Sequence, residues 1–379
     1  MTASMSRLAR SRTEKACMTF SLRICILSLI FAPLTTAWAD TVQPQPAWHA
    51  PLAAEALTLD LVRAGQRYVA VGERGHVLLS SDGRDWDQAE FVPVQATLTR
   101  VTFAGGRLWA VGHDSTIIHS RDMGRTWSLQ HFEPEWEKPL LDVHFFNANE
   151  GVAIGAYGLF MRTENAGHDW EVLNMADLVT SEAIDWEEAA QTADELEVEY
   201  DDDPFNGLDD FDDEYYDADL DFDRGCYEFM ECHLNAFLEM NNGHQMIAAE
   251  RGYGFRSTDR GQTWEAFRFP YPGSMFGLLH LGDGGIMAFG LRGNVQLSAD
   301  FGDSWEILDA GLQSSLKGGA SLGRGQFLMV GNGAARLRYD RTTGEFSLSE
   351  DRLGSSFVSV LVAEDGTIIL AGEDGLSYE

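Results

Sequence analysis

Positive charge is scarce in this chain of 379 residues, which has 27 lysine and arginine residues against 60 aspartate and glutamate residues. A formal net charge of −33 repels phosphate, so the composition argues against nucleic-acid binding. Long hydrophobic runs are also missing. The apolar stretch at residues 24–34 is too short to cross a bilayer as a helix.

That apolar stretch belongs to a predicted signal peptide covering residues 1–39. Basic residues precede it, and Ala37-Trp38-Ala39 supplies the small residues of a cleavage site. We therefore expect export to the periplasm and a mature chain that starts at Asp40.

Cysteine is rare as well, with four residues in the whole chain. The cysteines at positions 17 and 25 leave with the signal peptide, and Cys226 and Cys232 remain. Their spacing matches no zinc or redox motif. Because the periplasm permits disulfides, we favour a local bridge between them, with free thiols and then a metal site as the alternatives.

A short box recurs roughly every 41 residues along the chain. Three copies fit the pattern S-x-D-x-G-x-x-W, and two others depart from it slightly. The five copies span residues 80–86, 120–127, 163–170, 257–264 and 298–305. A repeat of this length is typical of a propeller, which is a closed ring of small sheets.

Each box stands where a hairpin turn is expected between two strands. Its Asp can accept backbone hydrogen bonds, its Gly can adopt a conformation that a Cβ penalises, and its Trp can fill the space between sheets. Equal copies in five repeats favour structural roles over catalysis. The predicted structural residues are Asp82, Asp122, Asp259, Asp300, Trp86, Trp127, Trp170, Trp264 and Trp305.

Seven repeats of apolar strand, turn and apolar strand predict an all-β propeller of seven four-stranded blades spanning residues 40–379. The last repeat, from Phe357 to Tyr378, ends without a box. Trp48 lies 38 residues before Trp86, close to the repeat length. We therefore expect the segment around Trp48 to supply the fourth strand of the last blade and so close the ring.

An acidic insertion at residues 177–239 makes the spacing between the third and fourth blades about 50 residues too long. It contains 24 acidic residues and a single basic one, Arg224. We expect it on the face that carries the turns between the inner strands, opposite the boxes. A solvated loop, a docking element for a basic partner and a calcium site are three interpretations.

The calcium hypothesis rests on an order of carboxylates that resembles an EF-hand loop. The candidate ligands are Asp217, Asp219, Asp221, Asp223 and Glu228. Phe222 occupies the position where the sharp turn of that loop needs Gly, so the match is poor.

The candidate binding site lies in the turns between the inner strands. Arg74, Arg251 and Arg292 hold equivalent places in three blades, where guanidinium groups could bind a carboxylate or a phosphate. Tyr253 completes the set. Pairing of each Arg with a nearby acid, or with the insertion, is the alternative. We expect no catalytic residue.

With its boxes, turns and seven repeats, the chain resembles the photosystem II stability/assembly factor family of Asp-box (BNR) propellers. Gly72-Glu-Arg-Gly-His-Val77 and Leu291-Arg-Gly-Asn-Val295, with their boxes, carry the resemblance. It implies a non-enzymatic propeller that assists assembly of a membrane complex through an arginine-rich patch. That patch maps to Arg74, Arg251 and Arg292. Apart from the calcium candidate, we expect no cofactor. Non-photosynthetic bacteria carry similar proteins, often beside resistance-nodulation-division exporters, so such an exporter is a candidate partner.

Sialidases share the Asp box, so a sialidase-like glycoside hydrolase is the alternative function. Those enzymes combine an arginine triad with a tyrosine nucleophile partnered by a glutamate. Here Tyr253 beside Glu250 and Arg251 is the one local cluster of that kind, and the F/Y-R-I-P motif is missing. We therefore favour a protein-binding scaffold.

Overall fold

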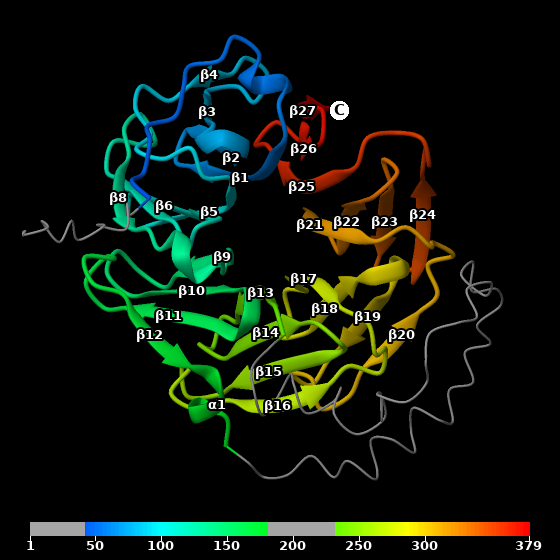
Figure 1. Cartoon of the computed structure of the whole chain (residues 1–379). Coiled ribbons are helices and arrows are strands. Elements are labelled where there is room, and N and C mark those ends of the chain that lie inside the picture. The colour runs from blue at the N-terminus through cyan, green and yellow to red at the C-terminus, as the bar shows by residue number, and fades with distance from the viewer. Residues whose placement is uncertain (1–41, 181–231) are drawn as a thin grey trace, which may run out of the picture. The chain divides into compact units, whose positions relative to one another are not determined.

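Seven small antiparallel sheets follow one another along residues 42–180 and 232–379, the parts of the chain described by the structure, which is a computed structural model (Figure 1). These residues belong to one unit, Val42–Glu379.

The first three sheets contain β1 (Thr58–Ala64), β2 (Arg67–Gly72), β3 (Val77–Ser80) and β4 (Asp87–Gln88); β5 (Leu98–Ala104), β6 (Arg107–Gly112), β7 (Ile117–Ser120) and β8 (Ser128–His131); and β9 (Leu140–Phe145), β10 (Gly151–Gly155), β11 (Leu159–Thr163) and β12 (Glu171–Asn174). The next three contain β13 (Leu234–Glu239), β14 (Gln245–Ala249), β15 (Tyr253–Ser257) and β16 (Glu265–Arg268); β17 (Met275–His280), β18 (Ile286–Gly290), β19 (Val295–Ser298) and β20 (Glu306–Leu308); and β21 (Leu316–Gly323), β22 (Gln326–Gly331), β23 (Arg336–Asp340) and β24 (Glu345–Ser349). The seventh contains β25 (Phe357–Val362), β26 (Ile368–Gly372) and β27 (Gly375–Tyr378). The short helical segments are η1 (Ala53–Glu55), η2 (Glu73–Gly75), η3 (Pro134–Trp136), η4 (Ala156–Gly158), α1 (Met175–Leu178) and η5 (Leu291–Gly293).

The first strands of the seven sheets surround one axis (Figure 1). Each packs against the first strand of the next sheet, in the order β1, β5, β9, β13, β17, β21 and β25, and β25 packs back against β1. The seven-bladed propeller predicted from the repeats is confirmed.

The second strands are the most deeply buried elements. Every residue of β10, β14, β18 and β26 is buried. Both faces of a blade pack against neighbouring blades, so these strands are continuous apolar runs rather than alternating ones. This is why the repeats stand out in the sequence.

The boxes close the turns between the third and fourth strands. In the second blade, Asp122 accepts hydrogen bonds from the Ser120 hydroxyl at 2.9 Å and from the Thr126 N–H at 2.9 Å. Gly124 has a φ of 87°, a left-handed conformation that favours glycine. Trp127 is 3% exposed and packs in a cluster that joins the first and second sheets.

The first strands share a bulge near their start. The register of each shifts between its first and third residues, which leaves the second residue out of the ladder. These bulged residues, all partly exposed, are Leu59, Thr99, Leu141, Asn235, Phe276, Lys317 and Val358.

Side chains at the third position form a charged network between the first strands. Arg100 of β5 lies between Asp60 of β1, at 3.5 Å, and Asp142 of β9, at 3.1 Å. Each carboxylate also accepts a backbone N–H from the next first strand, Val101 for Asp60 and Phe237 for Asp142. These bonds satisfy donors on strand edges that have no further strand to pair with.

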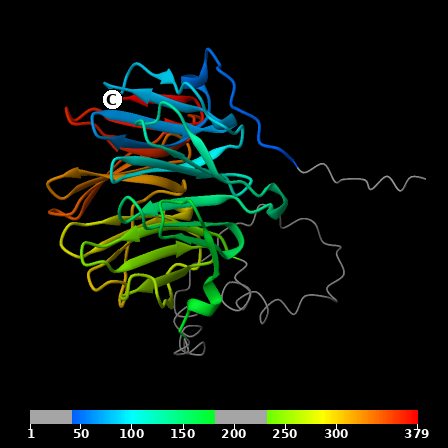
Figure 2. The same cartoon turned by 90° about the vertical axis from the view of Figure 1, so that its left-hand side faces the viewer.

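The predicted closure of the last blade by the segment around Trp48 is wrong. Within the described residues the seventh sheet has three strands, and Trp48 belongs to no strand and is 77% exposed. The segment lies along the first blade instead, where Ala47 N–H donates to the Val92 carbonyl and the Gln88 amide donates to the Trp48 carbonyl. Figure 2 shows this segment, in blue, along one side of the ring.

Proline explains why the segment does not pair as a strand. Pro44, Pro46 and Pro51 flank Trp48, and proline has no N–H to donate to a ladder. The ring closes instead through the packing of β25 on β1, where the Ser359 hydroxyl donates to Asp60 at 2.8 Å.

Candidate binding face

The turns between the second and third strands form one face of the ring, which we call the turn face. These turns are hydrogen-bonded to the segment that precedes the first strand of the same blade. The Glu73 N–H donates to the Leu57 carbonyl, and the His113 N–H donates to the Thr97 carbonyl. The boxes lie at the other end of the strands, on what we call the box face. The two faces therefore present different residues to a partner.

Four bulky residues occupy the same place in the turns of four blades. The tip residues are Arg74, Tyr157, Arg251 and Arg292, with φ between 52° and 57°. A left-handed backbone is uncommon for residues other than glycine and costs on the order of 1 kcal/mol. Each of these turns therefore holds a large side chain where glycine would be more comfortable. The box turns do the same at Met123, Arg260 and Phe301, so this conformation alone does not mark a functional position.

The three predicted arginines are distributed around the axis. Arg251 and Arg292 belong to neighbouring blades, the fourth and fifth, whereas Arg74 belongs to the first. Arg74 and Arg292 are exposed, and Arg251 is half-buried. Arg74 forms no hydrogen bond or ion pair with any described residue. The three arginines therefore belong to three different blades of the turn face.

Tyr157 was missed by the sequence reasoning. It is 51% exposed, and its ring meets the His233 ring edge-on at 5.1 Å. Glu250 holds His233 in place, since its carboxylate accepts the His233 N–H at 3.0 Å. The sequence did contain a signal for this residue, because Tyr157 precedes Gly158 just as Arg74 precedes Gly75.

The prediction that Tyr253 belongs to the binding site is wrong, because its side chain is fully buried and does not reach the turn face. The equivalent residues His76, Thr116 and Leu159 are also buried, so this position points between the sheets in several blades. The Arg268 guanidinium lies over the Tyr253 ring at 4.2 Å. The tyrosine therefore packs in the core, and the cluster that favoured a sialidase-like enzyme offers no accessible nucleophile.

The insertion is attached between the third and fourth blades. Val179 and Cys232 lie in the same hydrophobic cluster, and the Cys232 carbonyl accepts the Gly158 N–H on the turn face. Cys232 is disulfide-bonded. Its predicted partner Cys226 lies outside the described residues, so that pairing stays a prediction.

The calcium candidates and the signal peptide also lie outside the described residues. Within residues 42–180 and 232–379, no group of three or more His, Cys, Asp or Glu side chains is arranged to hold a metal ion. In the same ranges, no helix has the length and apolar character needed to cross a membrane.

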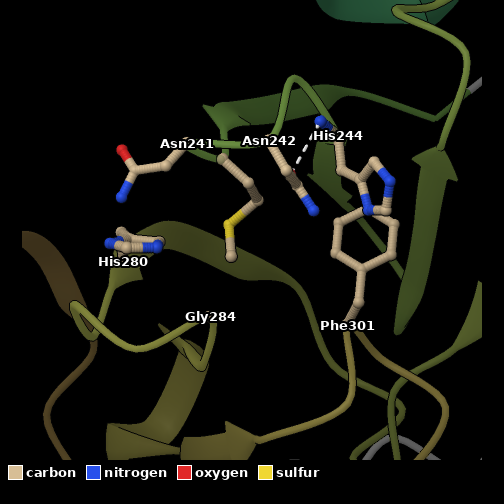
Figure 3. Close-up of a pocket in the computed structure, with 7 residues that line it drawn as sticks. Asn241, Asn242, His244, His280, Gly284 and Phe301 are labelled. Atoms are coloured by element: carbon tan, nitrogen blue, oxygen red, sulfur yellow. Dashed lines mark hydrogen bonds between the residues drawn. The ribbon is translucent and has the colours of Figure 1, made fainter.

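A pocket of about 170 Å³ lies on the box face between the fourth and fifth blades. His280 and Asn241 lie on one side of it, and His244 lies beside Phe301 on the other (Figure 3). Its residues come from turns opposite the tip arginines. It therefore forms no part of the turn face, which is the candidate binding face.

Comparison with known proteins agrees with the repeats and the fold. The BNR/Asp-box repeat model matches residues 255–266. The chain is thus a propeller that contains Asp-box repeats. No curated protein matches the sequence.

Among solved structures, YCF48 from Cyanidioschyzon merolae is 16% identical, with a TM-score of 0.61 over 86% of this chain and 96% of that one. YCF48 bound to D1 peptide is also 16% identical, with a TM-score of 0.59 over 89% of this chain and 95% of that one. The WD40 propeller domain of Doa1 is 12% identical, with a TM-score of 0.58 over 89% and 95%. The resemblance predicted from the sequence, to the assembly-factor propellers, is confirmed for the repeat and the fold.

Proposed function

We propose that this Asp-box propeller is an exported, non-enzymatic scaffold that binds a protein partner through its turn face and assists a membrane protein complex. The observation that carries the proposal is the set of large side chains held on left-handed turn tips, Arg74, Tyr157, Arg251 and Arg292. Arginine and tyrosine are enriched among the residues that dominate protein interfaces.

The fold comparison supports a peptide or protein as the ligand. One of the similar solved propellers is YCF48 bound to D1 peptide. For the present chain, a resistance-nodulation-division exporter is the candidate partner. The predicted signal peptide supports a periplasmic location. Detection of a mature N-terminus at Asp40 would show that the signal peptide is cleaved.

The test is a charge reversal on the turn face of the full-length protein. We expect Arg74→Glu combined with Arg292→Glu to reduce, at least tenfold, the partner that the immobilised protein captures from solubilised membranes. Arg324→Glu is the matched control, because Arg324 is also exposed, has the same φ of 54° as Arg292 and lies on the opposite face. Equal capture by the tip variant and the native protein would contradict the proposal.

A further inference from the structure

Lysine is almost missing from this chain, and one of its few lysines sits beside the axis of the ring. Lys15, Lys138 and Lys317 are the only lysines in the sequence. Lys317 is the bulged residue of β21, at the end of the strand that meets the turn face. Two residues before it, the Ser315 hydroxyl accepts the N–H of the Arg292 tip at 3.3 Å.

The ammonium of Lys317 lies against an aromatic ring. Its Nζ is 3.7 Å from the centroid of Phe276, the bulged residue of β17 in the preceding blade. The side chain is half-buried, and this burial lowers the pKa of Lys317 below its usual value. Within the described residues Lys317 forms no hydrogen bond or ion pair.

Polar residues at the same position in two other blades are satisfied locally. The Thr99 hydroxyl donates to the Leu140 carbonyl at 2.7 Å, and the Asn235 amide donates to the Met275 carbonyl at 2.9 Å. Lys317 makes no such bond to the next strand. A half-buried cation without an anionic partner costs free energy, so a bound anion would stabilise it.

We propose that Lys317 and Phe276 form a site that binds the C-terminal residue of a peptide, with the carboxylate on the ammonium and an apolar side chain on the ring. The inference rests on the proposed function, since the peptide would belong to the protein partner. A single ammonium is a point charge, whereas phosphate is better matched by the guanidinium fork. Leu59, Leu141 and Val358, the bulged residues of three other first strands, are apolar and partly exposed.

The shortage of lysine makes a direct experiment possible on the full-length protein. Reductive methylation with ¹³C-formaldehyde labels each lysine and keeps its charge. Lys317→Arg identifies the Lys317 signal by removing it. We expect N-acetyl-leucine to shift the Lys317 signal saturably and to leave the Lys138 signal in place. N-acetyl-leucinamide, the neutral analogue, should shift neither signal.

Two further variants measure the contacts. Lys317→Met should weaken N-acetyl-leucine binding at least tenfold in calorimetry, and Phe276→Leu should weaken it several-fold. The proposal is overturned if Lys317 does not respond, if Lys138 responds equally, or if the amide or inorganic phosphate produces the same shift. If the turn-tip arginine variants lose the partner but N-acetyl-leucine does not shift the Lys317 signal, the scaffold function is supported and the carboxylate site at Lys317 is rejected.

Discussion

Among the described residues, the carboxylate of Asp300 accepts hydrogen bonds only from residues of its own box. It accepts the Ser298 hydroxyl, the Ser304 N–H and the Ser304 hydroxyl. The Ser304 bonds hold the pKa of Asp300 down at about 2. Because every donor lies within four residues of Asp300, the turn is defined by local sequence, and the equivalent bonds recur at Asp259.

At the residue scale, Asp300→Asn should lower the free energy of unfolding at pH 7 by about 1 kcal/mol, since the exposed carboxylate is screened by solvent. A carboxyl whose pKa is depressed on folding stabilises the protein above its unfolded pKa of about 3.9. That stabilisation is lost as the pH falls towards 2. We expect the native protein to converge with Asp300→Asn over this range in urea denaturation.

The control for this comparison is Asp85→Asn. The Asp85 carboxylate accepts no hydrogen bond from a described residue. Its replacement removes a box carboxylate without removing a hydrogen bond to it, so it measures the effect of the lost charge alone. An identical acid profile for the native protein and Asp300→Asn would contradict the assignment.

At the scale of elements, the first strands are held together by side chains that reach between blades. Asp60, Arg100 and Asp142 occupy one equivalent position in three consecutive first strands. Burial raises the pKa of Asp60, although Arg100 opposes this effect. The two carboxylates depend on one guanidinium for their charge balance, so removing that cation should affect several strands at once.

We expect Arg100→Met to lower the free energy of unfolding by about 3 kcal/mol, because it leaves two buried carboxylates without their cation. Adding Asp60→Asn and Asp142→Asn should recover part of that loss, since the charges are removed together. Chemical denaturation of the three proteins measures both steps. Arg324→Met serves as the exposed control, and a loss for Arg100→Met no larger than the control's would argue against the network.

At the scale of the whole molecule, the ring closes by face-to-face packing of the first and last blades and not by a shared blade. The Ser359–Asp60 bond joins these blades at the axis, and η1 lies against β27. Both the N-terminal and C-terminal blades thus keep their own strands. The stability of the ring should depend on tryptophans between blades rather than on Trp48.

Replacing two tryptophans tests this account. Trp127→Ala should cost about 3–5 kcal/mol of unfolding free energy, because it empties a buried space between two blades. Trp48→Ala should change it by less than about 0.5 kcal/mol, as expected for an exposed side chain. Thermal and urea unfolding of the two variants give the comparison. A large loss for Trp48→Ala would restore the closure that the sequence predicted.

Much of the architecture could be predicted because the information repeats. Seven apolar runs, together with box residues such as Asp122 and Trp127, indicate the blade count, and their bonds are local. The candidate binding face stays a prediction, and the sequence indicated only some of its exposed residues. Arg74 and Arg292 are exposed on turn tips, but Tyr253 is buried and Tyr157 was missed. Whether the side chain of a turn residue is exposed depends on how the neighbouring blades pack, and the sequence of one turn does not specify that packing.

The sequence by itself determined that this protein is a ring of Asp-box blades, because each box and each buried strand specifies its own conformation over a few residues. Only the tertiary structure decided how the ring closes, which turn residues reach solvent, and that Arg100 and Lys317 meet partners about 40 residues away in the chain. Those features arise where first strands from different blades come together around the axis, a contact between segments that no local pattern encodes.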